Sequence, residues 1–360
     1  MKKVVFSLLL LMATSTIGVF AQSSLVATLI HNDTIFTAYY GLHALESAYN
    51  ASVDGDVITL SSGGFNAPGF IWKNITIRGV GMDKDTVNKV VPTILIGDFI
   101  TGSSPGTTPY NHLTMEGIWH DGTLSYARDY NYDGLDYALF VRCRFNEITA
   151  SSHSYELDNV KFIQCKIRNI TATGNATFLN CYVGALGRLY TSSNDASQMN
   201  YECVNCVVYG SLANAHVNHS TFTNCVLLGN KVLDASNMAY NCIGVYINKS
   251  DSINNLFSNV PDHFSNVCYR KVDEVFDVNS FDANGTDYYS DFDTYRLLDS
   301  VRTKYLGTDG TEIGMYGGFY PFSRETATSP RISKFVVDRK SSNGKLKVEV
   351  EVVDGADWVE

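Results

Sequence analysis

One short phrase recurs six times between residues 138 and 244, and it limits the folds open to this chain more than any other feature. Each copy has an apolar residue, a free position, a polar residue that is mostly Asn, a cysteine, a second free position and usually another apolar residue. The copies occupy residues 140–145, 162–167, 178–183, 203–208, 222–227 and 239–244. They lie about 16 to 25 residues apart, a spacing typical of solenoid proteins.

Within one copy, an inward residue, an outward residue and a one-residue interruption describe two short strands that meet at a bend. Side chains alternate along a strand, so an inserted residue would otherwise send every later side chain to the wrong face. Asn accepts the left-handed conformation that such a bend needs, whereas β-branched residues do not. Successive copies would lie about 4.8 Å apart, with the Asn amides in a ladder and the Phe and Cys side chains in interior stacks. The repeat therefore predicts an all-β fold, a parallel β-helix.

Residues 1–21 have the organisation of a secretory signal peptide. Two lysines precede an apolar run from Val4 to Met12, and Ala21 stands at the expected cleavage point. The apolar run is short for a membrane span, and no other run in the chain is long enough for one. We therefore expect cleavage near Ala21 and export to the periplasm, the cell surface or the medium. The alternative is a buried N-terminal helix.

The composition fits an exported solenoid. Hydrophobic residues make up 45% of the chain and charged residues 18%. The net charge of -10 argues against a nucleic-acid partner, because nucleic-acid-binding proteins usually carry a basic field. Eight cysteines would ordinarily indicate disulfides in an exported chain. The cysteines of the repeat share one column, where a small apolar side chain packs well and where Cβ atoms lie further apart than the roughly 3.8 Å of a disulfide. Free, buried thiols are favoured, and disulfides are the alternative.

The N-terminal part of the mature chain reads as a cap followed by the first coils. Residues 37–50 have apolar side chains on one side of a helix, with Thr37 as a candidate N-cap. Such a helix would cover the open edge of the first coil. The segment Trp72–Ile77 fits the strand, bend and strand pattern with Asn74 at the bend, and Met115–Ile118 fits it with Gly in that place.

The C-terminal part departs from the repeat. Residues 22–322 are expected to form the capped solenoid, and residues 323–360 a linker and a β-hairpin. The hairpin strands would be Arg331–Val337 and Lys345–Val353, on either side of an Asn-Gly turn. So small a unit does not form an independent domain. It would pack along the solenoid, cover its last coil or pair with another chain.

The two ends also resemble a known group. This group is the right-handed parallel β-helix proteins of the pectin-lyase-like type, which bacteria export. Their first coils are similar to segments 44–48, 54–58 and 74–79 of this chain, and their last coil is similar to segments 295–297 and 307–318. The resemblance covers about residues 35 to 320. It implies a single-stranded right-handed parallel β-helix solenoid with an N-terminal capping helix, followed here by the short hairpin. It implies no particular chemistry, because this fold carries lyases, hydrolases, epimerases, adhesins and inert passengers.

The enzyme signatures of that group do not match this chain. The Arg-x-Pro-x-x-Arg segment of pectate lyases is missing, and residues 118–121 hold the Ile, Trp, His and Asp of a second lyase element in another order. The Asp-Asp and Gly-His-Gly segments of polygalacturonase-like hydrolases are missing too. We assign no catalytic residue. Four histidines are candidate general bases or simply solvated side chains: His120, His153, His216 and His219.

A candidate metal loop precedes the first clear repeat. Asp129, Asn131 and Asp133 alternate and are followed by Gly134, and Asp136 would supply a further carboxylate. Calcium takes six to eight oxygen ligands from a tightly bent chain. The twelfth position from Asp129 is Phe140 rather than Glu, so the loop is not an EF-hand. Ca²⁺ is the one candidate cofactor, and an ordinary polar loop is the alternative.

Five residues are candidates for contact with a carbohydrate. Tyr130, Tyr132 and Tyr137 would stack on sugar rings. Arg144 and Lys166 share an outward column and would bind an acidic sugar, unless they belong to an ordinary solvated face.

Two classes of function follow from these observations. One is a non-catalytic exported protein that binds glycans or has a structural role at the cell surface. The other is a polysaccharide lyase or glycoside hydrolase that acts on an acidic polysaccharide. An acidic cleft with converging Asp or Arg residues on one sheet would favour the enzyme, and a smooth, weakly charged face the binding protein. The oligomeric state is not predicted.

Overall fold

The computed structural model describes residues 25–84, 91–102, 112–126, 135–150, 157–172, 174–187, 199–209, 219–229, 236–246, 265–269, 271–277, 295–323, 331–337 and 348–353, with residues 233 and 257. Within these ranges, none of the helices combines the length and the apolar character needed to span a bilayer.

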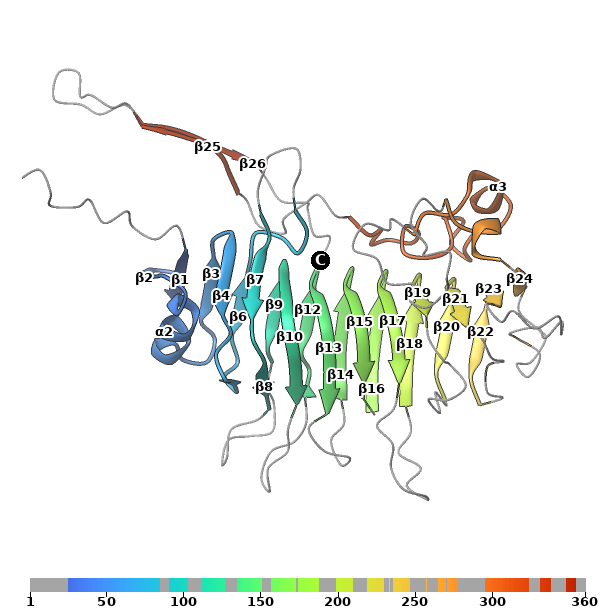
Figure 1. Ribbon diagram of the computed structural model, residues 1–360, viewed down its shortest axis with the longest axis horizontal. Helices are drawn as coiled ribbons and strands as arrows, with labels where there is room; N and C mark the ends of the chain where they lie inside the picture. Colours follow the sequence, from blue (N-terminus) through green and yellow to red (C-terminus); the bar gives the residue numbers. More distant parts are fainter. Residues whose placement is uncertain are drawn as a thin grey trace, which may run out of the picture.

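Two long sheets, here called sheet A and sheet B, make up most of the described chain (Figure 1). Sheet A consists of β1 (Val26–His31), β2 (Ile35–Tyr40), β3 (Val57–Leu60), β6 (Thr76–Arg78), β9 (Thr114–Glu116), β11 (Leu135–Asp136), β12 (Leu139–Val141), β14 (Leu157–Ile163), β16 (Gly174–Leu179), β18 (Met199–Val204), β20 (Thr221–Thr223) and β22 (Met238–Tyr240). Sheet B consists of β4 (Gly63–Asn66), β5 (Phe70–Ile71), β7 (Thr93–Ile96), β8 (Phe99–Thr101), β10 (Ile118–Tyr126), β13 (Arg144–Ala150), β15 (Lys166–Thr171), β17 (Tyr182–Gly187), β19 (Val207–Tyr209), β21 (Val226–Gly229), β23 (Ile243–Tyr246) and β24 (Val267–Tyr269).

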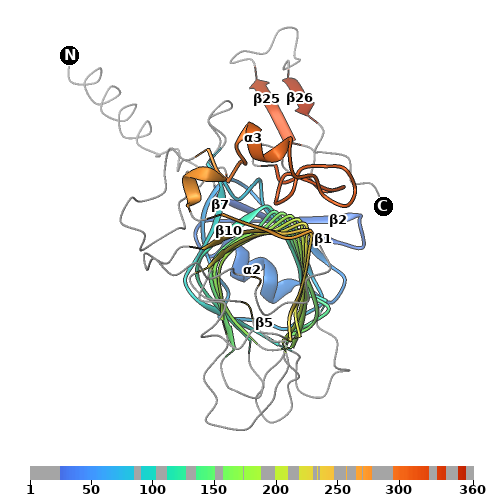
Figure 2. The ribbon, with the colours of Figure 1, turned by 90° about the vertical axis from the view of Figure 1, so that its right-hand side faces the viewer.

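The chain alternates between the two sheets, and we call one strand of sheet A with the following strand of sheet B a coil. Like strands of successive coils pair in parallel; only β1, which pairs with β2 and β3, breaks this rule within the two sheets. Viewed along the row of strands, the strands of successive coils superpose (Figure 2). The prediction of an all-β fold built from parallel strands is confirmed.

The predicted bend lies where each strand of sheet A meets the next strand of sheet B. The residue before each repeat cysteine has a positive φ, from +49° to +53°: Arg142, Gln164, Asn180, Asn205, Asn224 and Asn241. Gly117 fills this place one coil earlier, with φ +61°. Ser265 fills it one coil later, with φ +51°, and Val267 pairs with Ile243. The bend position was therefore predicted correctly in each copy of the repeat.

One bend was assigned wrongly. Arg78 pairs with Glu116, which directly precedes the bend at Gly117. The equivalent of that bend is therefore Gly79, and Asn74 lies before strand β6. The Asn74 side chain instead accepts the backbone N–H of His112 at 2.8 Å. The pattern around Asn74 resembles the repeat, but its apolar residues have a different register.

Stacked side chains fill the space between the sheets. The ring of Phe162 stacks on those of Phe140 and Phe178, with 5.0 Å between ring centroids in both pairs. All three side chains are fully buried. Burial of each contributes roughly 1.5–3 kcal/mol, and each aromatic contact adds about 0.5–1.5 kcal/mol.

The cysteines of the repeat form a second interior column, and each of them is a free, buried thiol. The column is also hydrogen-bonded. The Cys165 sulfur accepts the backbone N–H of Cys143 at 3.4 Å and has the Phe140 carbonyl oxygen at 3.3 Å as an acceptor for its own proton. The same pattern recurs at Cys181 and Cys206. Burial raises the pKa of the Cys181 thiol well above its usual value, which keeps the donor proton in place.

Asn266 occupies the thiol position in the next coil. Its Oδ1 accepts the backbone N–H of Cys242 at 2.8 Å, and its Nδ2 donates to the Ala239 carbonyl at 2.9 Å. These are the two bonds that a repeat thiol makes, so an amide ends the column with the same polarity. The repeat cysteines are packed in the interior, as predicted, and they also form hydrogen bonds that the sequence did not predict.

Residues 295–323, here called the C-terminal cover, do not form a last coil as their resemblance implied. Their described backbone pairings are isolated antiparallel bridges and the short helix α3 (Asp299–Arg302). The segment instead lies outside the coils, against the outer face of sheet B (Figure 2). Tyr295 stacks on Tyr182 of β17 with 4.1 Å between ring centroids, and the outward side chains of Val207 and Val226 are buried in the same cluster.

Most of the bend amides form hydrogen bonds with the C-terminal cover, whereas they were expected to bond to one another in a ladder. Nδ2 of Asn180 donates to the carbonyls of Met315 (3.0 Å) and Gly317 (2.6 Å). The described part of the column has one amide-to-amide bond, from Asn241 to Asn224 at 3.1 Å. A Cβ at Gly318, whose φ is +73°, would lie 2.0 Å from Nδ2 of Asn205. The bend amides therefore bind a distant part of the chain, and the expected ladder is wrong for most of the column.

The N-terminal cap differs from its prediction as well. Residues 37–40 belong to strand β2, and the helix α2 (Ala44–Ala51) begins after a turn, with His43 rather than Thr37 at its N-cap. Leu45 and Ala48 of α2 are fully buried, and the helix lies across the N-terminal end of the coils (Figure 2). The predicted helix of residues 37–50 was thus too long at its start.

Two further elements complete the described chain. The 3-10 helix η1 (Val272–Glu274) precedes the C-terminal cover. Strands β25 (Arg331–Val337) and β26 (Val348–Val353) form a separate antiparallel pair.

Candidate binding face

An exposed aromatic pair stands at the N-terminal edge of sheet B. Phe70 and Trp72 are 49% and 40% exposed, and their rings stack with centroids 5.3 Å apart and planes inclined by 22°. Ile71 between them is fully buried. This is the alternation of an extended chain, in which every second side chain faces outward. The pair therefore offers an apolar platform to solvent at a defined place on the surface.

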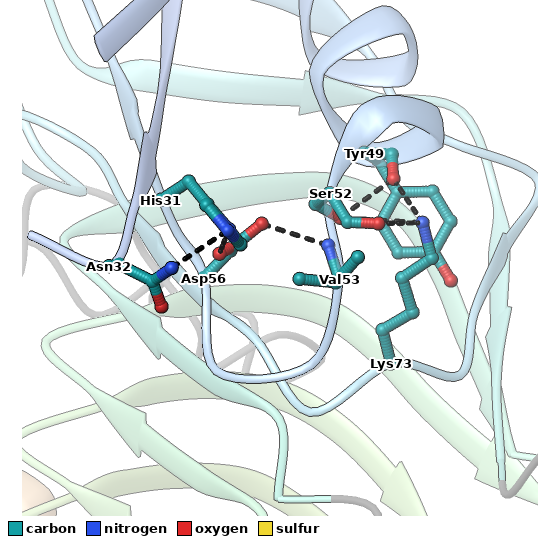
Figure 3. Close-up of polar contacts among 7 residues, drawn as sticks. All are labelled: His31, Asn32, Tyr49, Ser52, Val53, Asp56 and Lys73. Atoms are coloured by element: carbon teal, nitrogen blue, oxygen red, sulfur yellow. Dashed lines mark hydrogen bonds and ion pairs between the residues drawn. The ribbon is translucent and has the colours of Figure 1, made fainter. Parts of the chain in front are cut away.

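The segment that carries the platform is fixed to helix α2 (Figure 3). The backbone N–H of Trp72 donates to the Tyr49 hydroxyl at 2.9 Å. Nζ of Lys73 donates to the carbonyls of Tyr49 (2.6 Å) and Ser52 (2.7 Å) and lies 4.6 Å from the centre of the Tyr49 ring. A cation is favourable there because the C-terminus of a helix carries unsatisfied carbonyls and a partial negative charge.

The two ionisable side chains that fix this segment are Tyr49, which is buried, and Lys73, which is partly buried. Burial raises the pKa of the Tyr49 hydroxyl, and the hydrogen bond from Trp72 opposes the rise. Burial lowers the pKa of Lys73, and the charges of Asp54 and Asp56 oppose the fall.

One column of residues continues from Phe70 along sheet B, and three of its side chains carry hydroxyls. Phe70 pairs with Ile100, Ile100 with Ser125, Ser125 with Thr149, and Thr149 with Thr171. These side chains face outward, because the residues that follow them in β5, β8 and β10 (Ile71, Thr101 and Tyr126) are buried. Neighbouring strands lie about 4.8 Å apart. The face thus carries the aromatic rings at one end, then Ile100, and then three hydroxyl side chains on successive strands.

Three carboxylates of successive coils lie on the same outer face: Asp98 between β7 and β8, Asp121 in β10 and Glu147 in β13. Oδ1 of Asp98 accepts the backbone N–H of Thr123 at 2.7 Å. Oδ1 of Asp121 accepts Nδ2 of Asn146 at 2.7 Å, and Glu147 lies 3.5 Å from the Thr123 hydroxyl. Among the residues that the structure describes, no three His, Cys, Asp or Glu side chains are placed to hold a metal ion. The face therefore carries negative charge without a described metal site.

The two predicted sugar-binding cations are buried. Arg144 and Lys166 do pair in the same outward column. However, Arg144 is 7% exposed and Lys166 is fully buried, so neither belongs to a solvated face. The Arg144 guanidinium lies 4.3 Å from the centre of the Trp119 ring. The sequence did not predict this packing of Arg144 on Trp119, because outward positions of a strand were taken to be solvent-exposed.

The remaining predicted residues fall in two groups. Asp129, Asn131 and Asp133 of the calcium loop, together with Tyr130 and Tyr132, lie outside the described residues, as do His153 and His216. Asp136 lies in β11, where it pairs with Asp158. Tyr137 is 42% exposed and has φ +53°, and its ring centroid lies 5.5 Å from that of His112.

The two described histidine candidates differ in exposure. His120 is fully buried; its Nε2 contacts the Gly97 carbonyl at 2.9 Å, and burial lowers its pKa. A side chain enclosed by the core cannot act as a base on a polymer. His219 is exposed and has φ +58°, as expected for a turn residue.

Sequence reasoning did not single out Phe70 and Trp72. Their signal is a pair of aromatic residues at positions i and i+2 directly after Pro68 and Gly69. Two large rings on one side of a strand, next to a turn, indicate an aromatic surface.

Comparisons with known proteins add no family to this description: no family model, no curated protein and no solved structure matches the chain.

Proposed function

We propose that the protein is an exported right-handed parallel β-helix of the pectin-lyase-like type that binds a glycan without cleaving it. The alternation of strands between two parallel sheets supports the fold assignment. The leader-like residues 1–21 support export, with cleavage near Ala21. The mature protein would act in the periplasm, at the cell surface or outside the cell.

The observation that carries the binding proposal is the exposed Phe70–Trp72 pair. A pyranose ring has a face of C–H groups, and stacking it on aromatic rings removes apolar surface of both partners from water. Lys73 and Tyr49 hold the segment in place, so little ordering free energy is lost on binding. The hydroxyls of Ser125, Thr149 and Thr171 continue the site across successive coils and suit the many hydroxyls of an extended glycan.

The charge of the face favours a neutral glycan over an acidic one. Asp98, Asp121 and Glu147 lie on three successive coils, and the chain carries a net charge of -10. Like charges repel a polyanion unless a metal ion intervenes. Ca²⁺ in the loop of Asp129, Asn131, Asp133 and Asp136 remains a proposal, which calorimetry with the ion would test.

The same carboxylates favour one alternative, a glycoside hydrolase. Such enzymes place two carboxyl groups on either side of the scissile bond, and Asp121 and Glu147 come from neighbouring strands. Release of reducing ends that is lost in Asp121→Asn and Glu147→Gln would establish this alternative.

The test is binding to a panel of soluble polysaccharides by affinity electrophoresis and calorimetry, with neutral β-glucans, xylan and mannan beside pectate and alginate. We expect retention by a neutral glycan and a loss of about tenfold in affinity for Trp72→Ala, on the order of 1.4 kcal/mol. Phe319→Ala is the matched control, since Phe319 is 91% exposed and lies on the C-terminal cover. Unchanged binding by Trp72→Ala, or no binding to any glycan, would refute the proposal.

A further inference from the structure

Strand β2 is an unprotected edge of sheet A. In the described part of the chain, β1 is its one strand neighbour. Protein edges usually carry a charge, a proline or a bulge that prevents pairing with another chain. The sequence of β2, Ile-Phe-Thr-Ala-Tyr-Tyr, has neither charge nor proline, and its register with β1 is regular. Ile35, Phe36 and Tyr40 are 57%, 65% and 51% exposed.

The backbone of β2 has a defined polarity at this edge. In an antiparallel pair, every second residue exchanges both hydrogen bonds with its partner, and the residues between direct their polar groups to the other side. Gly41 donates its N–H to Leu25 at 3.0 Å, so residues 35, 37 and 39 bond to β1. Phe36, Ala38 and Tyr40 therefore direct their N–H and C=O groups to the open edge.

We propose that two copies of the protein associate through β2, as antiparallel strands about a two-fold axis beside Ala38. Ala38 then lies opposite Ala38 of the second copy, and Phe36 lies opposite Tyr40 of the second copy. Each of the three outward-directed residues enters a hydrogen-bonded pair, and the outer face gains two cross-strand aromatic pairs. A register centred on Thr37 would place Tyr40 opposite the turn and form fewer bonds.

The lack of charge on β2 suits this arrangement. Two chains of net charge -10 repel each other over most of their surfaces. The uncharged strand β2 is therefore a favourable place for two copies to approach.

The hairpin that presents β2 is already ordered. The imidazole Nδ1 of His31 lies 2.7 Å from Oδ1 of Asp56, whose Oδ2 accepts the backbone N–H of Val53 at 2.8 Å (Figure 3). Asp56 is 3% exposed, so these contacts tie the turn between β1 and β2 to the cap. An ordered strand loses little conformational entropy when it pairs.

The contact is small. A pair of six-residue strands buries less than about 1,200 Å² in total, which is typical of weak and transient complexes. The dimer should therefore depend on concentration, with dissociation in a roughly micromolar range or weaker.

Sedimentation velocity of the chain from Gln22 onward, between ~1 and ~500 µM, tests the proposal. We expect a shift from monomer to dimer in the wild type. Phe36→Lys should remain monomeric throughout, because a charge on the edge opposes pairing. Ile96→Lys is the matched control, since Ile96 is 47% exposed on sheet B. A wild type that is monomeric at every concentration, or a dimer that Phe36→Lys leaves intact, would overturn the proposal.

Crosslinking tests the register. Cys268 is exposed, so the variants carry Cys268→Ser. Paired residues of the proposed register have Cα atoms about 5.5 Å apart, within disulfide range, so Ala38→Cys should form a disulfide-linked dimer on mild oxidation. Thr37→Cys, one residue away, should do so poorly. Preferential crosslinking through Thr37→Cys, or growth into open filaments, which indicates a heterologous contact, would contradict the stated pairing.

Discussion

Asn180 links a bend of the coils to the C-terminal cover, and substitutions there separate two physical effects. The residue is 2% exposed, has φ +52°, and donates to two carbonyls of the cover. Asn180→Gly removes both hydrogen bonds but tolerates the positive φ. Each lost bond costs about 1 kcal/mol and leaves a buried carbonyl short of a donor, which adds about 1 kcal/mol or more. We expect Asn180→Gly to destabilise the docked cover by roughly 2–4 kcal/mol.

Asn180→Ala should cost more than Asn180→Gly, by roughly 1 kcal/mol, because a residue with a Cβ is strained in the left-handed region. This order is opposite to that at an ordinary strand position, where Gly costs more than Ala. Hydrogen exchange of residues 306–322 is the suitable assay, since proteins open locally as well as globally. If Ala proves as stable as Asn, or more stable than Gly, the account of the bend is refuted.

Three further predictions use other parts of the chain. Without reductant, a thiol reagent should modify one cysteine of the native protein, Cys268, and all eight in denaturant; fewer than eight would reveal disulfides. The pKa of His120 is lower in the folded protein than the value of about 6.5 expected in the unfolded chain. Its contribution to the free energy of unfolding is therefore complete above that unfolded pKa and decreases as pH falls below it, because the unfolded chain binds the proton first. The variant His120→Phe should therefore lose less stability between pH 7 and pH 5 than the wild type in urea titrations, and an equal loss in both would contradict this. Lys73→Met should lower the melting temperature and weaken glycan binding together, because it removes the cation from the C-terminus of α2 and loosens the Trp72 segment. Unchanged glycan binding would show that the Phe70–Trp72 pair does not depend on these contacts with α2.

The sequence predicted the interior of the coils well, because the repeat encodes it directly. The positive φ at Asn180, Asn205 and Asn224 follows from the conformational tolerance of Asn, and the buried Phe and Cys columns follow from alternation. Arg142 and Gln164 occupy the same bend without being Asn, and Nε of Arg142 donates to Oε1 of Gln164 at 2.6 Å. The recurring position therefore mattered more than the residue type.

Contacts between distant segments were not predictable in the same way. The glycines at 314, 317 and 318 indicated a last coil by resemblance, yet residues 295–323 cover the bend amides instead. Nothing local distinguishes an Asn that bonds to its neighbouring Asn from one that bonds to residue 315 or 317. The cap helix was extended over residues 37–43 because Tyr40 and Leu42 fit a helical spacing with Leu45 and Tyr49. The β-branched and aromatic residues from Ile35 to Tyr40, which follow a turn at Asn32 and Asp33, favour a strand, and they form one.

Rise per coil is the quantity on which the whole description depends, and pulsed electron–electron spin resonance measures it directly. Spin labels at Lys161 and Met238, in a Cys268→Ser background, are separated by four strand steps of sheet A. Labels at Thr114 and Met238 are separated by six. At about 4.8 Å per step, we expect separations of roughly 19 and 29 Å, in proportion to the number of coils. Separations far from these two values, or that do not grow by about two steps of 4.8 Å between the two pairs, would contradict the stacked-coil architecture.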